Sequence, residues 1–423
     1  MIENRGNWAA NYTYRAAHRH YPQTIEQIQE LVSRSSKLKA LGSRHSFNDI
    51  ADTPGDQIAL DHFDQVLALD REHHTVTVEA GIRYGQLARQ LHGAGYALPN
   101  LASLPHISVA GACATATHGS GDGQGNLATA VAALELVTAD GALVVLSRDR
   151  HGDQFPGAVV ALGGLGVVTK LTLNLVPTFA MRQDVYENLP LAQLADHFEE
   201  IVAGAYSVSL LTDWQNERVN LVWLKRRVVA GAPLPLAAEL FGATLAPTHR
   251  HPIVSLSAAA CTEQMGIVGP WYERLPHFRM DFTPSSGEEL QTEYLVPRRH
   301  ALAAFRAIDR VRHQIAPLLQ ISEVRTIAAD DLWMSPCYQQ SCVAIHFTWK
   351  KDWAAVRQLL PLIEEQLAPL NAVPHWGKLF TMPAARVQAR YPKLPDFQRL
   401  LRAYDPQGKF RNAFLDTYIF GTP

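Results

Sequence analysis

The segment from Leu98 to Gly125 constrains the fold of this chain more than any other stretch. It reads LPNLASLPHISVAGACATATHGSGDGQG, in which small residues dominate, and no Lys or Arg occurs between Arg89 and Arg148. Small residues let a backbone approach a ligand closely, and successive backbone N–H groups can hold an anion without side-chain charge. The segment therefore predicts either a stretch along which a pyrophosphate lies or a glycine-rich surface loop, and composition alone does not separate the two.

Two common nucleotide-binding signatures are missing from the sequence. No GxGxxG motif follows an expected strand, so a Rossmann dinucleotide site is unsupported. A GxxxxGK motif followed by Ser or Thr is also absent, which excludes a P-loop.

The first third of the chain begins with a well-marked helix. Thr24 is a good N-cap, and Gln27, three residues later, completes a capping-box pattern. Apolar residues then recur at helical spacing and fall on one face: Ile25, Ile28, Leu31 and Val32.

Strands are expected at 38–41, 75–80, 134–139, 143–146 and 167–175. The third and fourth flank Asp140-Gly141, which predicts a two-residue hairpin turn. Pro177 ends the last strand, and prolines become frequent from about residue 180. We therefore expect a domain boundary near Pro177.

Length and charge bound the kinds of partner. The 423 residues suffice for two or three domains, and the formal net charge is −2. Nucleic acid and anionic membranes both call for a strong basic excess, so neither is expected. The N-terminus lacks a signal-peptide pattern, and the apolar stretch 159–168 is too short to cross a bilayer. Four cysteines without metal-ligand spacing are expected to be buried thiols of a cytoplasmic protein.

The segment GSRHSFN, from Gly42 to Asn48, follows an expected strand and contains a candidate nucleophile. A sharp turn there would present His45, and a neutral imidazole can form a covalent bond to an electrophile. A single histidine among 18 is more often structural or exposed, so the residue type alone does not assign the role.

Polar pairs recur in two expected strands of the second half. Glu323 and Arg325 share one face of the strand 319–327, and His346 and Thr348 repeat the arrangement in the strand 343–349. Such pairs can line a pocket that hydrogen-bonds hydroxyl groups, or can form an internal salt bridge beside solvated faces. Lys378, after His375, is a further candidate, although a lone lysine is usually a surface residue.

Together these segments resemble the alditol oxidases (also called xylitol oxidases), within the vanillyl-alcohol-oxidase-type flavoproteins. GSRHSFN is similar to the flavin-attachment motif, and LPNLASLPHISVAG followed by THGSG resembles the loop that holds the pyrophosphate and the isoalloxazine. SEVRT, HFTW and PHWGK resemble the substrate-side motifs, and DPQGKFRN resembles the closing motif. The resemblance runs over nearly the whole chain, in the family's order. Arg44 stands where some members have glycine.

The resemblance implies an α+β protein with a two-domain PCMH-type FAD-binding fold and a separate α+β substrate domain. The FAD-binding domain, made of two lobes, would cover residues 1–178, and the substrate domain 179–404. The segment 405–423 would return to the FAD domain.

The implied cofactor is FAD, attached covalently through His45. The residues that would contact it are Gly42, Ser43, Arg44, His45, Ser46, Phe47, Asn48, Ser103, Ser108, Gly111, Thr115, Ala116, Thr117, His118, Val168 and His375. No resident metal, protein partner or membrane contact is implied, and we expect a monomer.

The implied reaction oxidises the terminal CH2OH of an open-chain polyol to an aldehyde, with O2 reduced to hydrogen peroxide. The substrate would lie among Ser103, Gln291, Glu323, Arg325, His346, Thr348 and Lys378. Arg325 and Lys378 are candidates for stabilising charge on the substrate oxygen, and Lys378 is also a candidate proton acceptor. Glu323, Thr348 and Ser103 would hydrogen-bond the other hydroxyls. The sequence does not separate the two roles of Lys378.

Two alternatives stay open. An enzyme of the same superfamily that oxidises a sugar 1,4-lactone is the nearer one, although SEVRT, HFTW and PHWGK favour the alditol branch. A non-catalytic flavin-binding or carbohydrate-binding protein is the more remote one, since a fold never proves a chemistry.

Overall fold

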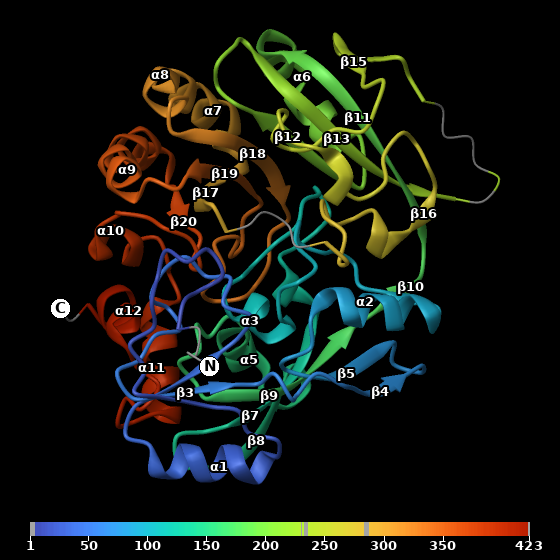
Figure 1. Cartoon of the computed structure of the whole chain (residues 1–423). Coiled ribbons are helices and arrows are strands. Elements are labelled where there is room, and N and C mark those ends of the chain that lie inside the picture. The colour runs from blue at the N-terminus through green and yellow to red at the C-terminus, as the bar shows by residue number, and fades with distance from the viewer. Residues whose placement is uncertain (1–4, 230, 232–235, 283–286, 422–423) are drawn as a thin grey trace.

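The computed structural model describes residues 5–229, 231, 236–282 and 287–421 (Figure 1). A first lobe carries a three-stranded parallel sheet in the order β1 (His18–His20), β3 (Asp56–Ala59), β2 (Leu38–Leu41). Strand β2 has the expected bounds and runs directly into Gly42.

Helix α1 (Ile25–Arg34) confirms the expected helix, but its capping box forms only in part. The backbone N–H of Gln27 donates to Thr24 Oγ1 at 3.3 Å, as expected for an N-cap. Gln27 Oε1, however, accepts from the backbone N–H of Gln23 at 2.7 Å, and not from that of Thr24. Ile28, Leu31 and Val32 are buried, so the predicted apolar face is correct.

The second lobe is a five-stranded antiparallel sheet. Its order is β4 (Val66–Asp70), β5 (Thr75–Glu79), β9 (Val167–Asn174), β7 (Val131–Val137), β8 (Leu143–Ser147). Strand β5 alternates as expected, with fully buried Val76 and Val78 between half-buried neighbours. Helices α2 (Tyr84–Gly93) and α3 (Val109–Ala114) follow β5 in the chain.

The expectation of a two-residue turn between β7 and β8 is wrong. The backbone N–H of Thr138 donates to Ala142 O at 2.9 Å, and that of Gly141 donates to Thr138 O at 2.8 Å. Gly141, at φ +84°, is the one residue of this loop in the left-handed region, whereas a two-residue type I′ turn needs two. Asp140-Gly141 therefore forms the end of a three-residue loop with a bulge.

The second half of the chain builds a ten-stranded sheet. Nine strands follow one path: β14 (Glu239–Leu240), β15 (Ala243–Leu245), β11 (Ala180–Pro190), β13 (Arg218–Val228), β12 (Ser207–Thr212), β18 (Leu319–Ile327), β19 (Cys342–Lys350), β17 (Glu289–Pro297) and β20 (Val373–Pro374). The short β16 (Gly269–Pro270) pairs with β11 off this path.

Strands β18 and β19 contain the two stretches expected from alternation, β18 with the expected bounds and β19 one residue longer at each end. Helices α6 (Leu191–Ala203) and α7 (Ala301–Asp309) pack against strands β12 and β17, and α9 (Trp353–Leu367) packs on α7. The two N-terminal lobes lie below this sheet in Figure 1. None of the helices in the described part of the chain is long and apolar enough to cross a membrane.

The C-terminal segment lies against the first lobe (Figure 1), beyond α11 (Leu394–Tyr404). Lys409 O accepts from the backbone N–H of Leu38 at 2.9 Å. Asn412 Nδ2 donates to three backbone carbonyls, those of Asp49 and Ile50 at 3.1 Å and that of Asp52 at 2.9 Å. The segment thus closes back on the N-terminal part, while the exact domain bounds stay a prediction.

Asn412→Ala should lower the free energy of unfolding by about 2 kcal/mol, because three buried carbonyls lose one shared donor. Asn412 Oδ1 also caps α12 (Ala413–Leu415) by accepting from the N–H of Leu415, and the variant loses that bond too. Chemical denaturation measures the effect. The control Asn216→Ala, at an exposed bend, should change the unfolding free energy by less than about 0.5 kcal/mol. Equal stabilities of the two variants would contradict the role given to Asn412.

Candidate active site

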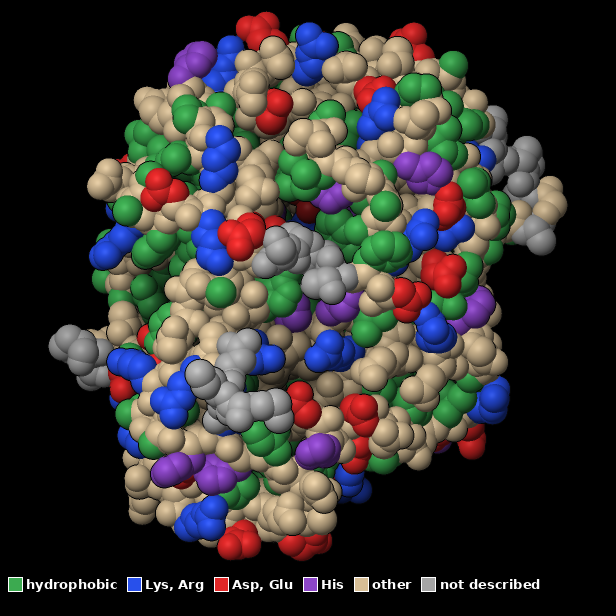
Figure 2. All heavy atoms as spheres, viewed as in Figure 1, with side chains coloured by type: hydrophobic (Ala, Val, Ile, Leu, Met, Phe, Trp, Pro, Cys, Tyr) green, Lys and Arg blue, Asp and Glu red, His purple; other side chains and the backbone are tan. Residues whose placement is uncertain are grey.

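A cavity of about 540 Å³ is lined by both N-terminal lobes and by the ten-stranded sheet. Figure 2 shows the molecule from the same side as Figure 1, with histidine and basic side chains near the middle of the face in view. The residues predicted for cofactor and substrate that border the cavity are Gly42, Ser43, Arg44, His45, Ser46, Phe47, Ser103, Ser108, Gly111, Thr115, Thr117, His118, Val168, Gln291, Glu323, Arg325, His346, Thr348, His375 and Lys378. Residues far apart in the sequence therefore meet in one place.

Asn48 and Ala116 are not among the residues that line this cavity. Asn48 Nδ2 donates to the carbonyls of Trp376 and Lys378, both at 2.8 Å. Asn48 therefore connects the segment 42–48 to the segment 375–378 by hydrogen bonds, without lining the cavity. Ala116 is 2% exposed and turns the chain at φ +51°.

Gly42 and Gly111 border the cavity where segment 42–48 meets the start of α3. A Cβ added at Gly42 or at Gly111 would lie 2.8 Å from Ser108 Oγ, which is too close for a side chain. The backbone N–H of Ser43 donates to Ser108 Oγ at 3.3 Å, and that of Ser108 donates to Ser43 Oγ at 3.1 Å. These reciprocal bonds hold two stretches of backbone at the cavity wall, where a ligand can approach them closely.

His45 is partly buried and neutral, and its Nδ1 atom is shielded from solvent. Its ring stacks on Trp8, with centroids 5.3 Å apart and an interplanar angle of 21°. Burial, with a smaller effect from His106, lowers the pKa of His45 to about 3. His45 Nδ1 has no hydrogen-bond partner among the described residues. An unprotonated buried nitrogen at a cavity wall is suited to act as a nucleophile.

Arg44 has a backbone conformation that glycine adopts more easily. Its φ is +63°, in the left-handed region, and its carbonyl accepts from the N–H of Trp8 at 2.8 Å. This conformation explains why glycine suits the same position in the resembling family.

Lys39 was not identified from the sequence. It lies on β2, borders the cavity, and donates from Nζ to the carbonyls of Leu162 at 3.1 Å and Gly163 at 3.0 Å. Burial lowers its pKa to about 7. A lysine inside the short apolar strand LKAL was the available signal. Lys39 thus adds an amine to the cavity wall.

Polar side chains form a row across three neighbouring strands of the large sheet. His346 on β19 lies opposite Glu293 on β17 and opposite Glu323 on β18. Two residues further along β19, Thr348 lies opposite Gln291 on β17. All five side chains border the cavity and are at least nine-tenths buried, so they line a pocket and do not form a solvated face.

Arg325 lies at the centre of this polar group. Its Nη2 donates to Glu293 Oε1 at 2.6 Å, its Nη1 donates to Ser103 Oγ at 3.4 Å, and its Nε is 3.8 Å from Glu323 Oε2. Burial would lower the pKa of Arg325, but the carboxylates of Glu323 and Glu293 outweigh it and raise the pKa. Arg325 therefore stays a cation inside the cavity.

Glu293 is the acidic partner that sequence analysis missed. Burial would raise its pKa, but Arg325 and then His118, whose Nε2 lies 3.3 Å from Oε1, hold the pKa well below 4.5. Glu289, Gln291 and Glu293 alternate along β17. The alternation that singled out Glu323 and Arg325 would have found Glu293 as well.

Lys378 approaches the cavity from the segment after β20. Its Nζ donates to Gln291 Oε1 and lies 5.1 Å from the centroid of the Phe47 ring. Burial lowers the pKa of Lys378, and Glu293 partly offsets that shift. Burial also lowers the pKa values of His346 and His375 to about 3, so both rings are neutral at ordinary pH.

One group of side chains has the geometry of metal ligands. Ligating atoms of His118, Glu293 and His375 lie within 4.8 Å of one another. These residues are far apart in the sequence, which is why no ligand spacing was visible. Glu293, however, already bonds the cationic Arg325, so the charge available for a metal is compensated. We assign the trio no metal.

Comparisons with known proteins agree with this geometry. Residues 16–147 match the FAD binding domain family, and residues 277–418 match the D-arabinono-1,4-lactone oxidase family. An FAD-binding part followed by a sugar-oxidase part defines the chain as a flavin-dependent oxidoreductase.

An alditol oxidase from a Streptomyces species is 50% identical over 98% of this chain and 99% of its own length. The L-gulono-1,4-lactone dehydrogenase of Mycobacterium tuberculosis is 30% identical over 92% of this chain and 91% of its own. The chain belongs to the alditol oxidase family, which confirms the resemblance seen in the motifs.

Among solved structures, cholesterol oxidase from B. sterolicum aligns with a TM-score of 0.77 at 15% identity, over 98% of this chain and 96% of that chain. At that identity the likeness shows the fold alone. Together with the FAD binding domain match, it confirms the predicted α+β fold of the vanillyl-alcohol-oxidase type.

Glu293→Gln should lower the free energy of unfolding by about 3 kcal/mol at pH 7, because Arg325 loses its nearest carboxylate in a buried setting. The folded pKa of Glu293 lies below its ordinary value of 4.5, so its stabilising effect is complete above pH 4.5 and is lost as the pH falls. The stability gap between wild type and variant should therefore narrow below pH 4.5 in urea denaturation. A gap that stays constant from pH 7 to the acid range would contradict this charge assignment.

Proposed function

We propose that this protein oxidises the terminal primary hydroxyl of an alditol to the corresponding aldose, with FAD as hydride acceptor and O2 as the final electron acceptor. The observation that carries the proposal is the cavity itself. It joins a cradle that contains Gly42 and Gly111, together with the partly buried His45, to a row of hydrogen-bonding groups around Arg325. The full-length likeness to a Streptomyces alditol oxidase supports the same substrate class.

The residues present fit FAD. The glycine floor of Gly42 and Gly111 admits close approach, and His45 Nδ1 is a buried nitrogen without a described partner. We propose that His45 forms the covalent bond to the flavin and that Lys39 adds positive charge near the phosphates. When bound, FAD would supply the hydride acceptor, and its electrons would then reduce O2 to hydrogen peroxide.

Arg325 is the proposed group for the substrate oxygen. It is held as a cation by two carboxylates, and in a buried cavity such a fixed charge stabilises negative charge developing on oxygen as the hydroxyl loses its proton. Lys378 faces the same cavity, and its lowered pKa suits it to accept the proton.

The other hydroxyls of the substrate have their own proposed partners. Glu323, Thr348 and Ser103 would hydrogen-bond them, with Gln291 and His346 completing the wall. Because these groups are buried, an analogue that lacks a hydroxyl would leave one of them unpaired.

A substrate panel separates the alditol from the lactone function. Peroxide release from xylitol and sorbitol should exceed that from a sugar 1,4-lactone by about tenfold or more in kcat/KM, because the lactone has a ring oxygen and a carbonyl where the open-chain polyol has hydroxyls to pair with the wall. The same enzyme preparation and oxygen concentration serve as the control. Faster turnover of the lactone would assign the chain to the lactone branch instead, and no turnover of either would favour a non-catalytic binding protein.

His45→Ala should abolish covalent attachment of the flavin without preventing its binding, because the cradle of Gly42, Ser108 and Gly111 stays intact. Denaturing the purified protein in acid and separating it on a gel reports flavin fluorescence on the protein band. Wild type should retain the fluorescence and the variant should release its flavin into the supernatant. Free flavin released from the wild type would contradict the covalent bond.

We propose the cellular compartment from the state of the cysteines. All four cysteines lie in the described part of the chain and are buried and free, which suits a reducing compartment such as the cytoplasm. The monomeric state and the division into domains at residues 178 and 404 stay predictions from the sequence.

A further inference from the structure

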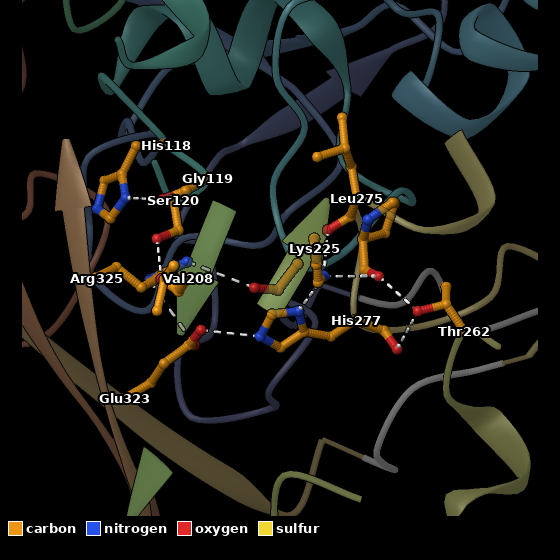
Figure 3. Close-up of polar contacts among 12 residues, drawn as sticks. His118, Gly119, Ser120, Val208, Lys225, Thr262, Leu275, His277, Glu323 and Arg325 are labelled. Atoms are coloured by element: carbon orange, nitrogen blue, oxygen red, sulfur yellow. Dashed lines mark hydrogen bonds and ion pairs between the residues drawn. The ribbon is translucent and has the colours of Figure 1, made fainter. Parts of the chain in front are cut away.

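A chain of buried polar groups runs from Glu323 through His277, which also borders the cavity, to Lys225 (Figure 3). Lys225 on β13 is 1% exposed, and its Nζ lies 3.0 Å from His277 Nδ1. His277 Nε2 in turn lies 2.8 Å from Glu323 Oε1. Neither Lys225 nor His277 was singled out in the sequence, because they are 98 and 46 residues from Glu323.

The hydrogen bonds fix where the protons are. Lys225 Nζ has three acceptors: the carbonyls of Leu275 at 2.5 Å and Pro276 at 3.2 Å, and His277 Nδ1. Burial lowers the pKa of Lys225 to about 7, and Nζ can donate both as an ammonium group and as an amine. The ionised Glu323 can only accept, so His277 Nε2 carries the proton that is donated to Oε1, and Nδ1 of the neutral ring accepts from Lys225. Burial lowers the pKa of His277 to about 4, consistent with a neutral ring.

This arrangement sets the state of Glu323. Its Oε1 accepts from His277, so the other oxygen, Oε2, is the one 3.8 Å from Arg325 Nε. Burial alone would raise the pKa of Glu323, but Arg325 and then His277 hold it well below 4.5. The groups that face Glu323 are Arg325 on its own strand, His346 on β19, His277 and Lys225 behind it, and Lys378 across the cavity.

We propose that Lys225 and His277 are positioning residues that hold Glu323 as an oriented carboxylate, with Oε2 left to accept a hydrogen bond from a substrate hydroxyl. The inference rests on the proposed alditol oxidation. Glu323 thereby has a role in specificity. It offers only an acceptor, whereas Arg325 and Lys378 offer donors. A hydroxyl of an open-chain polyol can donate to such an acceptor, whereas a ring oxygen or carbonyl of a lactone cannot.

The test uses two substitutions of the same histidine in the flavin-loaded enzyme. His277→Asn places its amide near the position of Nδ1, keeps a partner for Lys225 and withdraws the donor from Glu323. His277→Gln places its amide near the position of Nε2 and keeps that donor. We expect KM for xylitol to rise about tenfold in His277→Asn, the loss of one hydrogen bond to a charged group. The rise should be smaller in His277→Gln, and kcat should change less than KM in both.

A double-mutant cycle separates positioning from general damage. In a Glu323→Gln background, His277→Asn and Lys225→Met should have little further effect on KM, since the carboxylate through which they act is gone. Equal effects in both backgrounds would overturn the proposal. In the enzyme that keeps Glu323, Lys225→Met alone should raise KM. This variant provides the same test if a His277 variant does not fold.

Thr262→Val is the matched control. Thr262 Oγ1 donates to Pro276 O at 2.8 Å and supports the same loop, but it does not belong to the chain from Lys225 to Glu323. We expect its KM to stay within about twofold of wild type. A rise like that of His277→Asn would show that loop integrity matters and not the relay of hydrogen bonds. If wild type turns over xylitol and the His277 variants match it, only this inference fails; if wild type turns over no alditol, the proposed function fails as well.

Discussion

The buried ion pair between Arg325 and Glu293 is the interaction on which the rest of the site depends. The two side chains come from β18 and β17, on either side of β19, so the pair crosses three strands of the large sheet. Two opposite charges removed from water are tolerated only when each is well bonded, and here Glu323, His118 and Ser103 complete the set. The sheet thereby holds a permanent cation at the place where the substrate oxygen is proposed to lie.

The other wall of the cavity achieves its shape by different means. It uses backbone, with glycines where a side chain would collide and serines that bond across from segment 42–48 to α3. Asn48 and Asn412 fasten this wall to the segment around Lys378 and to the C-terminal segment. A cradle for a large cofactor and a polar pocket for a small substrate thus face each other across one space.

Sequence patterns predicted the local elements of this structure well and the contacts between them poorly. Alternation located β18 and β19 and put Glu323 with Arg325 because a strand has a period of two. The turn at Asp140-Gly141 was misjudged because its length depends on how β7 and β8 pair. Alternation along β17 would also have pointed to Glu293, but not to its pairing with Arg325. Lys225 and His277 were missed because their partners lie on other strands and loops, and no local rule encodes such pairing. The motifs of the family indicated which residues form the site, but not the hydrogen bonds between them.

In the proposed reaction, a polyol placed against the row of side chains around Arg325 gives a hydride to the bound flavin. Anaerobic mixing of the oxidised holoenzyme with xylitol, followed by the visible absorbance of the flavin, tests it in one turnover. We expect the absorbance to bleach on mixing and to return when air is admitted. A spectrum that stays oxidised with xylitol and sorbitol at saturating concentration would contradict it.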